Sequence, residues 1–223
     1  MSKEPTPEPQ RRSTHVAPGV VYAAVGASAA PDLMRFPPEG SLPYEYETQL
    51  GSGAERFLIA SNSLMTWGAQ RESGIRVRDI THGDGGQYAG VTFDENGTPQ
   101  ANGDAEIHYG PDGQPFITVG TEATLHWPDG RTPRRARVIA TVNEPRRIGF
   151  TWGSADTEGV FGEQMFAIEH RDDDTVWASV RGFLWLPDDG LFSIKGKAAG
   201  KQLIKEAHAQ LAALATGVVP TGD

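Results

Sequence analysis

The chain has 223 residues, no cysteine, and 20 basic against 29 acidic side chains, which gives a formal net charge of −9. Without cysteine it can form no disulfide, thiolate metal site or thiol nucleophile. Its acidity disfavours nucleic acid and anionic membranes as partners, because both attract cationic surfaces. No apolar run approaches the roughly 18 residues that span a bilayer, and the polar N-terminus lacks the apolar centre of a secretory signal. We therefore expect a soluble cytoplasmic protein of unknown oligomeric state.

The chain contains one apolar-rich block, which indicates a single domain at residues 17–216. Residues 1–16 and 217–223 are predicted to be disordered tails, because they offer too little apolar surface to offset the entropy of ordering. The polar, glycine-rich stretch 82–115 is too long for a structureless loop in a compact domain, so we expect an extra hairpin there.

The first regular elements are predicted to be a strand and a helix. Residues 44–50 alternate between large and charged or amide side chains, which indicates a half-buried strand. After a Gly-Ser-Gly turn, Ser52 and Glu55 have the spacing of a capping box. The apolar residues that follow, including Leu58 and Leu64, recur at helical spacing, and Gly74 ends the helix.

Five strands and a final helix are expected in the rest of the chain. Residues 116–127 and 134–142 are predicted strands joined by a Pro-Asp-Gly turn, and residues 149–185 contain three more. Short connections make successive strands antiparallel. The segment Leu191–Ala215 is predicted to be a helix with an apolar stripe and an opposite row of lysines. The fold class is therefore α+β, a curved antiparallel sheet of six or seven strands wrapped around a long C-terminal helix.

Six arginines crowd into the 17 positions from 131 to 147, in and around the predicted strand 134–142. They are Arg131, Arg134, Arg135, Arg137, Arg146 and Arg147. Two interpretations stay open: a solvated face of one hairpin, or an anion contact at the mouth of a cavity.

The last predicted strand has two chemically different faces. One face carries a mixed aromatic and polar set: Trp177, Ser179, Arg181, Phe183 and Trp185. Two interpretations stay open. The set could look into a cavity, where Arg181 would meet a ligand carboxylate, Glu163 or Glu169, or it could be core packing with Arg181 in a surface ion pair.

No sequence motif indicates a metal, a cofactor or a known catalytic triad. The six histidines show no metal-ligand spacing. The Gly-Ser-Gly turn lacks the third glycine and the parallel strands of a dinucleotide site. We expect neither a metal nor a cofactor.

Three groups of residues together resemble a known family. They are Tyr22 to Ser28, Gly51 to Phe57 with Trp67, and Val142 to Trp177 with its Gly-Phe-Thr-Trp-Gly and Gly-Glu-Gln-Met-Phe sequences. The combination resembles the bacterial and plant family called domain of unknown function 1990, over about residues 22–214. Its layout is similar to that of the START-like, helix-grip superfamily, which includes the birch-pollen allergen and polyketide cyclases. The resemblance implies a hydrophobic cavity between the sheet and the last helix.

The chain departs from the family pattern in several places. Trp152, Ser154 and Ala155 stand where a Tyr-Gly-Thr-Leu sequence is expected, and the following loop lacks a usual histidine. A Glu-Glu pair is Glu163-Gln164 here, and the stretch 82–115 is longer. If that histidine and second carboxylate carry chemistry in the family, this member has lost it.

The preferred hypothesis is a cavity protein that binds a small, mainly apolar or amphipathic molecule. The expected aromatic walls are Trp152, Phe166, Trp177, Phe183 and Trp185, with Arg181 and Glu163 as polar anchors. A second hypothesis is a cyclase- or hydrolase-type enzyme with Glu163 as general base. A third is a ligand-free structural or interaction domain.

Overall fold

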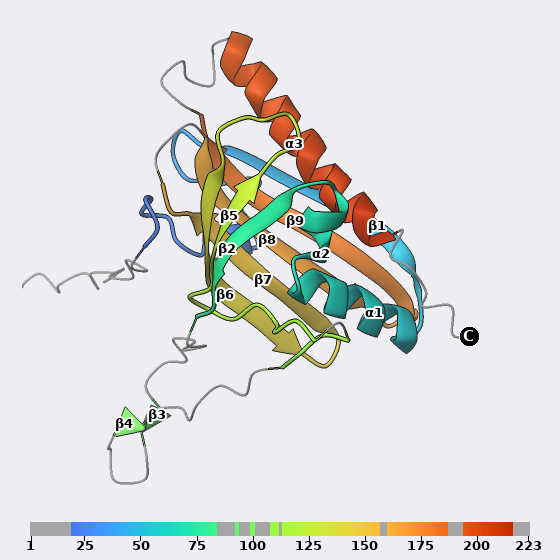
Figure 1. Cartoon of the computed structure of the whole chain (residues 1–223). Helices are drawn as coiled ribbons and strands as arrows, with labels where there is room; N and C mark the ends of the chain where they lie inside the picture. Colours follow the sequence, from blue (N-terminus) through green and yellow to red (C-terminus); the bar gives the residue numbers. More distant parts are fainter. Residues whose placement is uncertain are drawn as a thin grey trace, which may run out of the picture.

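The computed structural model describes residues 19–83, 92–93, 99–100, 108–111, 113–156, 160–186 and 194–215. Seven strands form one antiparallel sheet in the order β1-β9-β8-β7-β6-β5-β2 (Figure 1). Their bounds are β1 Leu42–Ser52, β2 Arg76–Thr81, β5 Glu122–His126, β6 Arg134–Glu144, β7 Arg147–Ser154, β8 Phe161–His170 and β9 Thr175–Trp185. The helices are η1 Ala27–Ala29, α1 Ala54–Met65, α2 Gly68–Glu72 and α3 Ile194–Ala215. The predicted fold class is confirmed.

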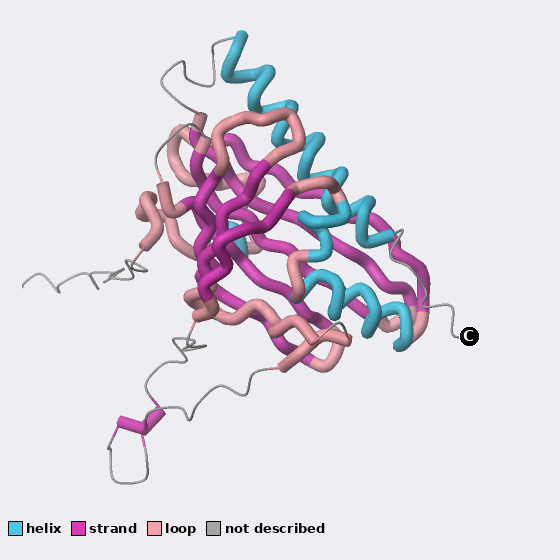
Figure 2. Tube along the Cα trace, viewed as in Figure 1, coloured by secondary structure: helices cyan, strands magenta, loops and turns pink. Residues whose placement is uncertain are grey.

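The three α-helices lie on the same side of the sheet (Figure 2). We call the side that they cover the helix face and the opposite side the outer face. The helix α3 contacts β1, β9 and α2, while α1 contacts β7 and β8. Along α3 the predicted apolar stripe is buried, and it consists of Leu203, Ala207, Leu211 and Leu214. Lys201 and Lys205 are exposed on its other side, so the amphipathic pattern correctly gave the orientation of α3.

The pairing of the strands shows which side chains share a face. In β9, Val180 and Leu184 belong to the core under the helices, whereas Phe183 packs in a second cluster on the outer face. Since neighbouring residues of a strand point to opposite sides, the register then assigns β8. Glu163 lies opposite Phe183 and therefore on the outer face, and Gln164 lies on the helix face.

The outer face is not bare, because residues 19–36 cover part of it. We call these residues the N-terminal segment. Tyr22 and Leu33 of this segment pack with Phe183 in the second cluster. The partly buried side chains of Phe161 and Trp185 pack against this cluster. The segment therefore buries with its own apolar side chains a sheet face that would otherwise meet water.

The start of α1 differs from the sequence-based expectation. Gly53, with φ of 89°, is the N-cap residue, and no side chain caps the helix, so the predicted capping box of Ser52 and Glu55 is wrong. Leu58, placed on the buried face, is 59% exposed. The helix also breaks after Met65, because Trp67 adopts a left-handed backbone conformation between α1 and α2. The break turns α2 toward α3.

The middle of the chain contains less strand than expected. Only Glu122–His126 of the predicted strand 116–127 is β structure. Two short strands, β3 Thr92–Phe93 and β4 Pro99–Gln100, pair antiparallel within the stretch 82–115. Most other residues of that stretch lie outside the described residues, as do both predicted tails, 1–16 and 217–223.

Candidate functional site

Two of the seven expected site residues lie on the helix face. Trp152 on β7 is 2% exposed, and Phe166 on β8 is fully buried and stacks on Phe150 with ring centroids 5.8 Å apart. Both belong to the core between the sheet and the helices. They have the location that the hypothesis of a cavity under α3 requires.

Four others lie on the outer face of β9. The indole N–H of Trp177 donates a hydrogen bond to the hydroxyl of Thr175. The rings of Phe183 and Trp185 pack against each other with centroids 5.2 Å apart. Arg181 donates to the carbonyl of Ala30, and its Nε lies 3.8 Å from Glu45 on the adjacent strand. This cross-strand arrangement matches the surface ion pair that the sequence left open.

Glu163, the seventh, is completely buried on the outer face and holds the N-terminal segment. Its Oε2 accepts hydrogen bonds from the Tyr22 hydroxyl at 2.9 Å and the Gly26 amide at 2.8 Å. Its Oε1 accepts from both the amide and the hydroxyl of Ser28. A side chain at Gly153 would collide with Tyr22, because an added Cβ would lie 2.0 Å from its hydroxyl oxygen. We call the hydrogen bonds that Glu163 accepts from Tyr22, Gly26 and Ser28 the N-terminal clasp.

The seven residues therefore do not line one cavity between the sheet and α3. Trp152 and Phe166 face the helices, and Glu163, Trp177, Arg181, Phe183 and Trp185 face the other way. The Glu163 carboxylate is occupied by four donors of the clasp. A general base needs hydrogen-bond reach to a substrate, and the neighbours of this carboxylate are parts of the chain itself.

The clasp makes stability depend on pH in the alkaline range. Burial raises the pKa of Tyr22, and the charge and hydrogen bond of Glu163 act in the same direction. Above about pH 10, where tyrosines of the unfolded chain ionise, the folded protein therefore binds more protons, and its free energy of unfolding falls as pH rises. We expect urea denaturation between pH 9 and 11 to show a shallower pH dependence for Tyr22→Phe. Equal slopes in both proteins would contradict this.

A different set of polar groups is buried on the helix face. The Tyr44 hydroxyl and the indole nitrogens of Trp127 and Trp152 have no hydrogen-bond partner in the described part of the chain. Burial raises the pKa of Tyr44, which keeps its hydroxyl neutral; Gln164 lies near it, but not in hydrogen-bonding geometry. Such groups are rare, since most buried polar atoms in folded proteins are bonded.

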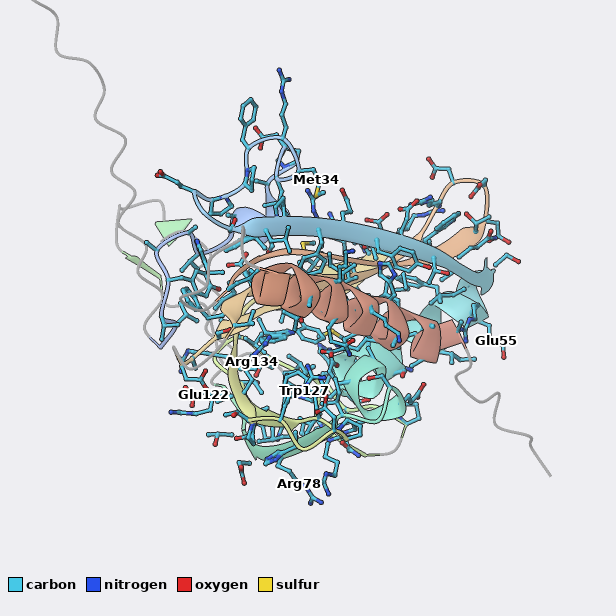
Figure 3. All side chains as sticks on the ribbon, turned by 90° about the horizontal axis from the view of Figure 1, so that it is seen from above. Met34, Glu55, Arg78, Glu122, Trp127 and Arg134 are labelled. Atoms are coloured by element: carbon cyan, nitrogen blue, oxygen red, sulfur yellow. The ribbon has the colours of Figure 1, made fainter. Side chains whose placement is uncertain are left out.

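Arg134 lies among these groups. Its guanidinium carbon is 5.3 Å from the ring centre of Trp127 and 6.0 Å from that of Trp152. We call Tyr44, Trp127, Arg134 and Trp152 the inner polar cluster. Figure 3 shows Trp127 and Arg134 on the inner side of the curve that the sheet makes around α3, whereas Glu122 and Arg78 point outward.

The charge of Arg134 has no ion-pair partner among the described residues. Burial lowers the pKa of its guanidinium, although the charges of Glu206 and Asp156 act in the opposite direction. Glu206 pairs instead with Arg131 at 2.6 Å. The side chain of Arg134 is nevertheless only partly buried. A guanidinium that is removed from bulk water yet retains accessible surface is positioned to meet a small molecule.

A pocket of about 240 Å³ opens beside the inner polar cluster. Its lining residues, which define the side pocket, are Ser73, Ile75, Trp127, Pro128, Asp129, Arg131, Gln202, Glu206 and Ala209. Trp127 belongs to both the pocket and the cluster. The volume exceeds the roughly 150 Å³ that admits a benzene-sized molecule in a protein core. An enclosed cavity between the sheet and α3 stays a prediction.

The sequence carried a signal for Arg134 that its crowding with other arginines concealed. Within β6, Arg134 shares a face with Ala136 and Val138, which are both 1% exposed on the helix face. Arg135 and Arg137 lie on the opposite face of the strand, where both pair with Glu122. Strand periodicity alone therefore separates one inward arginine from its two outward neighbours.

Two kinds of site have no support in the described residues. No three histidine or acidic side chains there come together as metal ligands. No helix in the same part of the chain is long and apolar enough to cross a membrane.

The chain is similar to solved structures at low sequence identity. A hypothetical protein, jhp0584, from Helicobacter pylori shares 10% identity and a TM-score of 0.47, over 82% of this chain and 90% of that one. The structure of Ara h 8.0201 shares 12% identity and a TM-score of 0.43, over 78% and 98%. Neither likeness is close enough to carry an argument about function.

No curated protein matches the chain. A family model does: the one described as "Domain of unknown function (DUF1990)" matches residues 21–95 and 108–188. This match includes most of the N-terminal segment, all seven strands of the sheet, Glu163 and Arg134. The chain belongs to the DUF1990 family.

Proposed function

We propose that the protein binds a small, mainly apolar molecule between the helix face of its sheet and α3. The observation that carries the proposal is the inner polar cluster. Three buried donors without partners in the described region, from Tyr44, Trp127 and Trp152, belong to the mainly apolar core on the helix face. A few unpaired polar groups among aromatic and aliphatic walls are typical of small-molecule sites.

The walls available to such a ligand are apolar. Phe150, Phe166 and Leu211 are fully buried on this side of the sheet. The side pocket lies next to this region, since Trp127 forms part of its wall. The proposal gives Glu163 no part in binding, because its four hydrogen bonds hold the clasp on the outer face.

Binding of a neutral apolar probe tests the proposal. We expect N-phenyl-1-naphthylamine to become fluorescent with the wild-type protein and to raise its melting temperature. Ala209→Trp places a large ring in the side pocket, because Ala209 is an exposed residue of α3 that lines it. The affinity should fall about ten-fold or more, equivalent to losing roughly 1.4 kcal/mol of binding free energy.

Ala212→Trp is the matched control, because Ala212 is exposed on the same helix outside the pocket lining. It should bind the probe as the wild type does. Two results would count against the proposal: no probe binding by the wild type, or equal binding by both tryptophan variants.

A further inference from the structure

We infer that the ligand is an amphipathic anion with one negative charge, a fatty carboxylic acid, and that Arg134 holds its carboxylate. This inference rests on the proposed function and specifies the polar end of the ligand. Removing a charge from water costs free energy, even where the side chain is only partly buried, as Arg134 is. A guanidinium in such a place is favoured when another group compensates its charge.

The described chain compensates the charge of Arg134 only in part, and it does so without an ion pair. The two acids whose charges act on Arg134 are Glu206 and Asp156. Glu206 lies 2.6 Å from Arg131, and Asp156 accepts a hydrogen bond from the backbone amide of Arg135. Neither forms an ion pair with Arg134 in the described part of the chain. The neighbouring aromatic rings attract the cation, but they provide no negative charge.

The hydrogen-bond donors of the inner polar cluster suit a carboxylate. A guanidinium offers parallel N–H donors that match the two oxygens of a carboxylate. The hydroxyl of Tyr44 and the indole N–H of Trp152 are further donors on the same side of the sheet. All of these groups donate, which suits a ligand end that only accepts hydrogen bonds.

The charge count favours a single negative charge. Arg131 is the other cation near Arg134, and its charge is already offset by Asp129 and Glu206, each 2.6 Å away. Asp156 also acts on Arg134 through its charge, so a monoanion would meet less repulsion there than a phosphate dianion. The apolar walls of the helix face then accommodate the hydrocarbon part of the acid.

Decanoic acid and decanol test the inference, since they share a chain and differ in the charged end. Each is titrated against the protein loaded with N-phenyl-1-naphthylamine at pH 8, and displacement is measured. The wild type should bind decanoate about ten-fold or more tightly than decanol. Arg134→Met should remove this preference, so that decanoate and decanol bind with similar affinity, and Arg134→Lys should retain part of it.

Arg135→Met is the control, because this arginine is the next residue of β6 and reaches Glu122 on the other side. It should bind both compounds as the wild type does. Without any ligand, Arg134→Met should melt at a higher temperature than the wild type, because it removes a partly buried charge that has no ion pair among the described residues. This second readout also shows that the variant folds.

The outcomes separate the two proposals. If neither the probe nor decanol binds to the wild type, the proposed function fails. If both bind but decanoate has no advantage, or the advantage survives in Arg134→Met, the function stands and the anionic ligand is overturned.

Discussion

Replacing Glu163 by glutamine is expected to lower the free energy of unfolding by about 3 kcal/mol. The wild-type carboxylate accepts four hydrogen bonds from Tyr22, Gly26 and Ser28, and it is fully buried. Glutamine has the same shape, but its amide nitrogen would point at donors and leave them unsatisfied. Charge-assisted hydrogen bonds are also about twice as strong as neutral ones. Urea denaturation at pH 7 measures the difference.

Glu169→Gln is the matched control for this change. Glu169 lies on the same strand and the same face, but it is partly exposed and pairs with Arg147 at 3.2 Å. Ion pairs of this kind contribute between about 0 and 1 kcal/mol. Both variants should bind N-phenyl-1-naphthylamine like the wild type. Equal stability losses in the two variants, or loss of probe binding only in Glu163→Gln, would contradict a purely structural role of the clasp.

Shortening Leu211 to alanine is expected to lower the free energy of unfolding by about 3 kcal/mol. Leu211 is fully buried in the core between α3 and the sheet. Its removal takes apolar surface out of the core and leaves a cavity, and both effects destabilise the folded state. Lys205→Ala, on the exposed side of α3, should change stability by no more than about 0.5 kcal/mol. Similar small effects at both positions would show that α3 does not dock on the sheet in solution.

The architecture followed from the sequence because it depends on local periodicity. Alternation in β9 separated its residues correctly into two faces, and the apolar stripe of α3 predicted its buried side. Short turns then imposed antiparallel pairing. These features are encoded within a few consecutive residues, so they need no knowledge of distant contacts.

The sequence did not show which of the two faces of β9 lies toward the last helix. Both faces are rich in apolar side chains, and the one with Trp177 and Trp185 offered the more familiar chemistry of a binding site. The N-terminal segment that covers part of it contacts Glu163 from more than 130 positions away in the chain. Two of the bonds come from backbone amides, which have no signature in the side-chain sequence. Phe183 and Trp185 of the aromatic set therefore pack beneath this segment.

The candidate site was partly visible. Trp152 and Phe166 were correctly placed on the side of the sheet that faces the last helix. Arg134 was noticed only as one of six crowded arginines, with an anion contact as one of two interpretations. Of its two aromatic neighbours, Trp152 lies on β7 and Trp127 directly follows β5, so only the folded sheet brings them together.

Photo-crosslinking locates the ligand and so tests the central claim most directly. A ten-carbon carboxylic acid with a diazirine near the end of its chain would be bound, irradiated and mapped by peptide mass spectrometry. The account predicts adducts on α3 and on helix-face residues such as Phe150 and Phe166, all competed by decanoate. Adducts confined to the outer face, around the N-terminal segment and Trp177, would contradict it.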